Sequence, residues 1–130
     1  MSIPVDLDAL ADTITERGPV AYFLTGGPDG RPHATHATVE MADGVIRVPA
    51  GRKTARNAGD RPAVSLLWPP SEEGGYSLIV DGDAVVEGTA GEDAVAVVTP
   101  TFAVLHRPAD HAPAEGDAGA CGSDCQPVGS

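Results

Sequence analysis

The stretch that most restricts the fold is residues 46–57, which read IRVPAGRKTARN. An apolar segment rich in β-branched residues is followed by Gly51 and then by residues that are compatible with a helix ending at Gly59. This order predicts a strand that passes through a glycine into a helix. Because the N-terminus of a helix exposes unpaired backbone N–H groups and carries a partial positive charge, the junction is suited to an anion.

Basic side chains gather at this junction although the chain as a whole is acidic. Its 130 residues include 8 Lys and Arg against 19 Asp and Glu, a formal net charge of −11. Five of the eight basic residues fall within positions 47–61, where Asp60 is the one acid. They are Arg47, Arg52, Lys53, Arg56 and Arg61. Charge alone leaves two explanations open, a solvated basic helix face and a pocket for a small anion such as phosphate.

Composition limits the class of protein. The length indicates one domain, and the negative charge argues against binding nucleic acid or an anionic membrane. No apolar run approaches the roughly 20 residues of a membrane-spanning helix. The N-terminal residues lack the basic and apolar regions of a signal peptide, so we expect a cytoplasmic protein.

The pattern of apolar residues and turn residues predicts a mainly β domain. Helices are expected at 6–17, 52–58 and 92–98, and turns at 26–30 and 43–44. Strands are expected at 20–25, 33–41, 45–48, 63–68, 76–80, 84–87 and 101–106. Local sequence makes Asp81-Gly82 a hairpin turn between two of these strands. His33 and His36 lie three residues apart, so they should point to opposite faces of their strand and cannot share a metal.

The composition changes after Arg107. Residues 108–130 are rich in Pro, Gly and Ala and contain one branched aliphatic residue, so they predict a flexible acidic tail after a domain of residues 1–107. Cys121 and Cys125 are expected to be free thiols. A reversible disulfide and a metal site with His106 and His111 are the alternatives. We expect no metal, because glycines surround the two cysteines.

Several segments in a fixed order resemble one known family. They are residues 46–51, 52–54 with Asn57, 63–66 and 78–84. Over about residues 5–107 the chain resembles the pyridoxamine 5′-phosphate oxidase-like, FMN-binding split β-barrel family, and within it the small bacterial FMN-binding proteins. The resemblance implies a six-stranded antiparallel split β-barrel with two or three short helices. It also implies a homodimer with FMN at the subunit interface, and one bent strand over 76–87 in place of the hairpin.

The resemblance further implies which residues bind the cofactor. The phosphate would be held by the residues of the helix junction, which are Arg52, Lys53, Thr54, Asn57 and Arg56. The ribityl chain and ring would lie along residues of two strands, which are His36, Thr38, Val48, Pro49 and Ala50. No catalytic acid or base is identified.

The implied function is that of an FMN-dependent oxidoreductase or flavin carrier with a small-molecule substrate. Oxidation of vitamin B6 is not expected, because an acidic tail replaces the basic C-terminal extension of the oxidase itself. One alternative is a reductase that uses the 8-hydroxy-5-deazaflavin coenzyme, whose oligoglutamate tail would need basic residues outside 47–61. Those residues are Arg17, Arg31 and Arg107. A non-redox module that binds haem or another ligand is the other alternative.

Overall fold

The computed structural model describes residues 1–108, which form one antiparallel sheet with two α-helices and a short 3₁₀-helix. The helical segments are η1 (Leu7–Ala9), α1 (Leu10–Arg17) and α2 (Arg52–Asp60). The strands are β1 (Ser2–Pro4), β2 (Val20–Gly26), β3 (Pro32–Thr38), β4 (Glu40–Ala42), β5 (Val45–Pro49), β6 (Ala63–Trp68), β7 (Ser77–Glu87) and β8 (Val95–His106).

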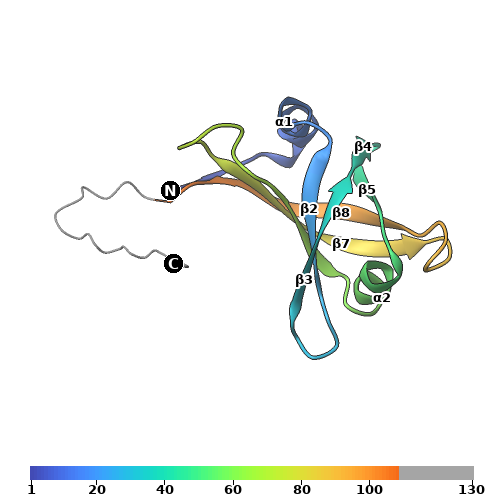
Figure 1. Ribbon diagram of the computed structural model, residues 1–130. Helices are drawn as coiled ribbons and strands as arrows, with labels where there is room; N and C mark the ends of the chain where they lie inside the picture. Colours follow the sequence, from blue (N-terminus) through green and yellow to red (C-terminus); the bar gives the residue numbers. More distant parts are fainter. Residues whose placement is uncertain (109–130) are drawn as a thin grey trace, which may run out of the picture.

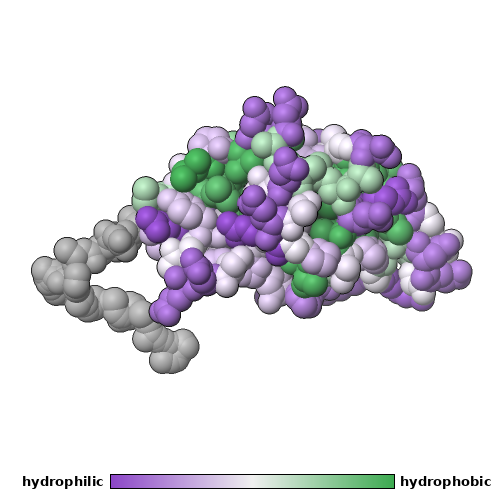
Figure 2. All heavy atoms as spheres, turned by 90° about the horizontal axis from the view of Figure 1, so that it is seen from above, coloured by the Kyte–Doolittle hydropathy of each residue, from purple (hydrophilic) through white to green (hydrophobic). Residues whose placement is uncertain are grey.

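The strands follow the order β3-β2-β6-β7-β8-β5-β4, and β1 pairs with the C-terminal end of β8. The sheet is curled, and the β2–β3 hairpin crosses the long strands β7 and β8 (Figure 1). Its buried apolar residues form one core cluster. α1 and α2 lie on opposite sides of these strands. The largest fully buried side chains include Trp68, Phe23 and Leu10. Figure 2 shows that hydrophilic residues cover much of the face near α1, with separate hydrophobic patches between them.

The predicted mainly β class is confirmed, but the strand count differs from the expected six. Residues 1–108 contain eight strands, of which β1 and β4 have only three residues each. The expected strand 33–41 was wrong as a single element. It breaks at Val39, whose side chain enters the core and whose amide donates to the Pro19 carbonyl at 2.7 Å. Before this break the chain pairs with β2 as β3. After it, the chain continues as β4, which pairs with β5.

The predicted helix over 92–98 is also wrong. Glu92 and Asp93 belong to a turn in which both amides donate to the Thr89 carbonyl, and β8 begins at Val95. Alternate residues from Ala94 to Val98 are buried, the period of a strand. Because β8 pairs with β5 on one side and β7 on the other, its backbone hydrogen bonds go to the sheet.

β7 is one continuous strand with a bulge at Asp81/Gly82, so the bent strand implied by the resemblance is confirmed over the hairpin. Gly82 faces Pro100, and Asp81 faces Phe102, so one residue of β8 has no opposite partner. A Cβ at Gly82 would lie 2.5 Å from the Thr99 oxygen, so only glycine fits. Pro100, which has no N–H to donate, is tolerated at such an irregularity.

The other expected elements are present at nearly the expected residues. α1 begins with a 3₁₀ turn that Asp6 caps, and it buries Leu10 and Ile14. The Asp43-Gly44 turn joins β4 to β5, and both residues have positive φ, 56° and 80°. From residue 109 onward the expected tail, with Cys121 and Cys125, lies outside the described residues.

Candidate functional site

The N-terminus of α2 presents free backbone donors. The Ala50 amide donates to the Ala94 carbonyl at 3.0 Å, which fixes the chain just before the helix. Gly51 is the N-cap residue, and no side chain caps the helix. The Ala55 amide donates to the Gly51 carbonyl at 2.8 Å, and the N–H groups of residues 52–54 precede that first helical bond. These three donors and the helix dipole create positive potential at this point.

The Thr54 side chain lies at the same end of α2 and is buried, with 3% of its surface exposed. Its hydroxyl makes no hydrogen bond to any of residues 1–108, whereas the similarly buried Thr25 hydroxyl accepts one from Asn57. A buried polar group without a partner costs about 1–3 kcal/mol. The Thr54 hydroxyl is therefore a donor that fits an acceptor such as a phosphate oxygen.

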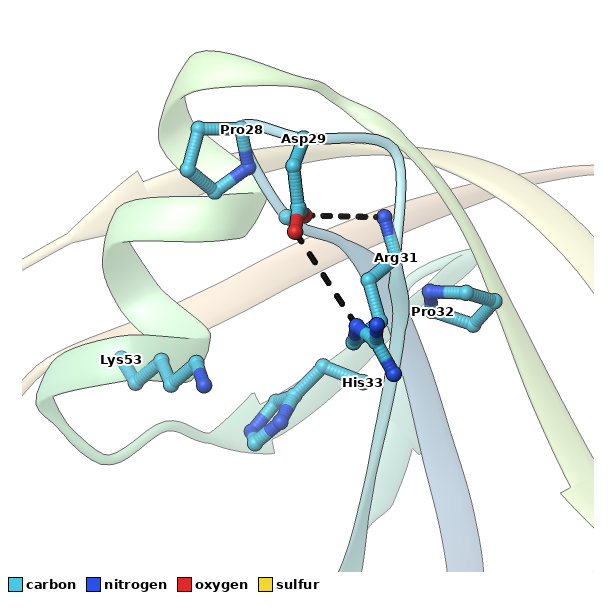
Figure 3. A pocket seen from close by; sticks show the side chains of 7 residues that line it. Pro28, Asp29, Arg31, Pro32, His33 and Lys53 are labelled. Atoms are coloured by element: carbon cyan, nitrogen blue, oxygen red, sulfur yellow. Dashed lines mark hydrogen bonds and ion pairs between the residues drawn. The ribbon is translucent and has the colours of Figure 1, made fainter.

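Lys53 lines a cleft of about 430 Å³ between α2 and the turn that joins β2 to β3. In Figure 3 its side chain extends toward His33 of β3, while Arg31 lies on the hairpin beside them. The Asp29 carboxylate accepts a hydrogen bond from the Arg31 amide at 3.1 Å and lies 4.0 Å from its Nε. The turn is thus held by its own contacts, and basic groups stand on both sides of the cleft.

Asn57 and Arg61 join α2 to the end of β2. The Asn57 amide nitrogen donates to the Thr25 hydroxyl at 3.2 Å, and its oxygen accepts from Arg61 at 3.4 Å. The Arg61 Nε donates to the Gly26 carbonyl at 2.7 Å. Asn57 is buried and would have to release one of these bonds to contact a ligand, so its visible role is to position the helix.

The structure separates the five basic residues that are close in sequence. Arg47 of β5 forms an ion pair with Glu87, the last residue of β7, at 3.3 Å. The Arg52 guanidinium lies against Gly91 in the loop after β7, where a Cβ would come within 2.5 Å of it. The residues that remain near the β2–β3 turn are Lys53, Arg56 and Arg61.

The other predicted residues do not gather around this cleft. His36 and Thr38 lie on the exposed face of β3, and the His36 ring packs against Tyr22 with centroids 5.2 Å apart. Val48 is fully buried, so its side chain is closed to a ligand. The two members of this group with exposed surface beside the helix junction are Pro49 and Ala50.

The two histidines of β3 lie on opposite faces, as predicted. His33 faces inward with half-buried neighbours, while His36 is on the exposed face. Within residues 1–108 no group of three His, Cys, Asp or Glu side chains could hold a metal ion. None of the helices in this part of the chain is long and apolar enough to cross a membrane.

The sequence named Arg31 only as one of three bases available to a deazaflavin tail and did not place it beside Lys53. Arg31 directly follows the Asp29-Gly30 turn and precedes β3, and Gly30 has the positive φ of 82° that such a turn favours. The packing of that turn beside Lys53 is a tertiary contact without a local signal.

Two curated proteins are similar in sequence, and no protein-family model matches the chain. They are uncharacterized proteins of Mycobacterium bovis and Mycobacterium tuberculosis, each 43% identical over 93 residues. The matched region covers 70% of this chain and 58% of each relative. The chain thus spans little more than half the length of these relatives.

Solved structures share the fold at low sequence identity. A putative pyridoxamine 5′-phosphate oxidase from Listeria innocua has a TM-score of 0.62 and 20% identity, covering 77% of this chain and 98% of its own. An F420 reductase has a TM-score of 0.58 and 20% identity, covering 78% and 98%. The haem storage protein HutZ from Vibrio cholerae has a TM-score of 0.58 and 14% identity, covering 77% and 94%.

These likenesses define the architectural class. The chain has the fold of the pyridoxamine 5′-phosphate oxidase-like split-barrel proteins, as the sequence resemblance implied. The fold alone is common to proteins named for different ligands, so the assignment of a cofactor depends on the residues at the helix junction.

Proposed function

We propose that the chain binds a flavin cofactor through its phosphate and acts as an FMN-dependent oxidoreductase or flavin carrier in the cytoplasm. The observation that carries the proposal is the buried hydroxyl of Thr54, which has no partner within residues 1–108 and lies beside the uncapped N-terminus of α2. Helix N-termini and hydroxyl donors are common partners of phosphate groups in proteins.

Different residues of the helix junction would contact different parts of the cofactor. The amides of residues 52–54 and the Thr54 hydroxyl would bind phosphate oxygens, and the Lys53 ammonium would neutralise their charge. Pro49 and Ala50, which lead into the helix, would lie along the ring. When bound, the flavin supplies hydride or electron transfer, and the chain supplies the anchoring and the exclusion of water.

We further propose that the protein is a homodimer. An outward-facing apolar row crosses four strands, since Tyr22 faces Leu67, Leu67 faces Ile79, and Ile79 faces Val104. Tyr22 is 40% exposed, and Phe102 on the same face is 49% exposed. An exposed apolar surface of this kind is typical of a protein interface. The predicted ligand residue His36 lies at its edge beside Tyr22 and would then face the partner.

The two alternatives are supported by different relatives of the fold. An F420 reductase favours a deazaflavin coenzyme, which also carries a phosphate and would use the same helix junction. HutZ favours haem, whose carboxylates need cations but not a helix N-terminus. The uncapped α2 and the Thr54 hydroxyl support a phosphate-bearing cofactor over haem.

A comparison of FMN with riboflavin tests the proposal, because the two ligands differ only in the phosphate. We expect quenching of flavin fluorescence to show FMN binding at least about 30-fold tighter than riboflavin, from two or more charge-assisted hydrogen bonds. Equal affinities, or no retention of FMN at micromolar concentration, would contradict the phosphate site. A parallel titration with haemin distinguishes the haem alternative, and light scattering measures the oligomeric state.

A further inference from the structure

We propose that the cleft between the β2–β3 turn and α2 is a second anion subsite, which takes a phosphate or carboxylate group beyond the one held at the helix N-terminus. The inference rests on the proposed function, because the subsite adjoins the proposed position of the cofactor phosphate. It adds a class of ligand, namely a molecule or pair of molecules with at least two anionic groups.

Two adjoining hollows form the subsite. One has a volume of about 430 Å³ and the other about 240 Å³, and both are lined by Pro28 of the turn and Lys53 of α2. The first extends along the hairpin to His33, and the second extends along the helix to Arg61. Lys53, whose side chain extends toward His33 in Figure 3, therefore lines both hollows.

The cations that line this groove have few partners. Lys53 and Arg56 are three residues apart on α2, so they share one face of the helix. Neither forms an ion pair or a side-chain hydrogen bond with residues 1–108. Arg31 contacts Asp29 at 4.0 Å, but their side chains are 83% and 69% exposed, so this pair contributes little. Asp60 is the other acid of the groove.

Of the four basic side chains outside the groove, Arg52 lies against Gly91 in the loop after β7, and the other three are engaged elsewhere. Arg47 pairs with Glu87, Arg17 donates to the Tyr76 carbonyl, and Arg107 lies over the Tyr76 ring at 4.8 Å. The unpaired positive charge of the described residues is thus concentrated beside α2, in a chain whose formal net charge is −11. Such a charge distribution directs anions to the groove and repels them from the rest of the surface.

Two sources could provide the second anionic group. It could be an extension of the cofactor itself, such as the carboxylates of a deazaflavin tail, or it could belong to a separate anionic substrate. Both would present the same anionic group to Arg31 and Arg56. They differ in whether the subsite stays free for another molecule when FMN is bound.

The test uses inorganic tripolyphosphate and orthophosphate as probes in calorimetric titrations of the full chain. We expect tripolyphosphate to bind at least about tenfold tighter than orthophosphate, because it can contact both the helix junction and the groove. Arg56→Gln and Arg31→Gln should each weaken tripolyphosphate binding about three- to fivefold, the range for exposed ion pairs. Arg107→Gln is the matched control, since it removes the same charge at the other end of the sheet, and should have less than about a twofold effect.

FMN titrations of the same variants separate this inference from the proposed function. We expect Arg31→Gln to leave FMN affinity within about twofold, because Arg31 is not among the residues proposed to hold the single FMN phosphate. If tripolyphosphate shows this residue dependence while FMN does not bind, the subsite stands and the flavin proposal fails. If tripolyphosphate binds no tighter than orthophosphate, or Arg107→Gln weakens it as much as Arg56→Gln, the subsite is refuted.

Two further measurements identify the source. Tighter binding of the oligoglutamyl deazaflavin coenzyme than of FMN, lost in Arg56→Gln, would show an extended cofactor. Simultaneous binding of FMN and pyrophosphate, with the pyrophosphate affinity lowered by Arg56→Gln, would show a separate anionic substrate. Each result supports the subsite and names the source of its second anionic group.

Discussion

Replacement of Thr54 by valine should have opposite effects on stability and on cofactor binding. Valine keeps the shape and the β-branching of threonine and removes only the hydroxyl, which is buried and makes no hydrogen bond within residues 1–108. An unsatisfied buried polar group costs about 1–3 kcal/mol, of which we expect valine to recover about 1 kcal/mol in the cofactor-free protein. The free energy of unfolding should therefore rise.

The same substitution should weaken FMN binding. A hydrogen bond to a charged acceptor contributes about 1.5–3 kcal/mol, so its loss should raise the dissociation constant at least about tenfold. Urea unfolding of the cofactor-free protein gives the first quantity, and quenching of flavin fluorescence gives the second. A gain in stability with a loss of affinity is the signature of a donor that is held for a ligand.

Thr25→Val is the matched control. This threonine is 4% exposed and differs from Thr54 in having a partner, because its hydroxyl accepts a hydrogen bond from Asn57 at 3.2 Å. Valine at position 25 leaves the Asn57 amide without its acceptor and should lower stability by about 1–3 kcal/mol. If Thr54→Val destabilises the protein as Thr25→Val does, or leaves FMN affinity unchanged, the hydroxyl is not a cofactor donor.

Three further substitutions test the fold and the site. Gly82→Ala places a Cβ 2.5 Å from the Thr99 oxygen and should lower the free energy of unfolding by about 1–3 kcal/mol or more, measured in urea. Lys53→Gln should weaken FMN binding about tenfold. Arg47→Gln removes an equal charge that is already paired with Glu87, and it should change FMN affinity less than about twofold. Equal effects of the two variants would mean that only the net charge of the protein matters. Asn57→Ala breaks one buried and one part-buried hydrogen bond and should cost about 2 kcal/mol. An unchanged unfolding midpoint would rule out its positioning role.

Elements that depend on local chemistry were predicted from the sequence. The Asp43-Gly44 turn follows from the tolerance of these residues for positive φ, and α1 follows from the helical spacing of Leu10 and Ile14. Both features need no information from distant residues. The helix junction at Gly51 belongs to the same category, because a strand, a glycine and a basic helix start are adjacent in the chain.

Elements that depend on partners across the sheet were not predicted from local sequence. Residues 92–98 can form a helix, but β8 gains hydrogen bonds from β5 and β7 at once, and this tertiary pairing decides the outcome. Asp81-Gly82 has the composition of a hairpin turn. Gly82 instead lies flat against β8, where only the absence of a Cβ allows the two backbones to approach.

The distribution of basic residues changes the choice between FMN and the deazaflavin coenzyme. From the sequence, the bases outside 47–61 that could serve an anionic tail are Arg17, Arg31 and Arg107. The structure engages Arg17 and Arg107 at Tyr76, which removes them from this role. It also separates Arg47 and Arg52 from the other bases of the cluster, because residue parity in β5 and helical phase in α2 direct the side chains to different neighbours.

Arg56 therefore joins Arg31 in the groove beyond the proposed phosphate position, although it was counted in the sequence as part of the phosphate cluster. In the proposed binding mode a single phosphate monoester contacts the α2 amides, Thr54 and Lys53, so Arg31 and Arg56 remain available. Charge alone thus does not separate FMN from the deazaflavin alternative once the groove is included. A cofactor with a second anionic group uses the unpaired cations of this groove more completely than FMN does, and the Arg56→Gln titrations decide between them.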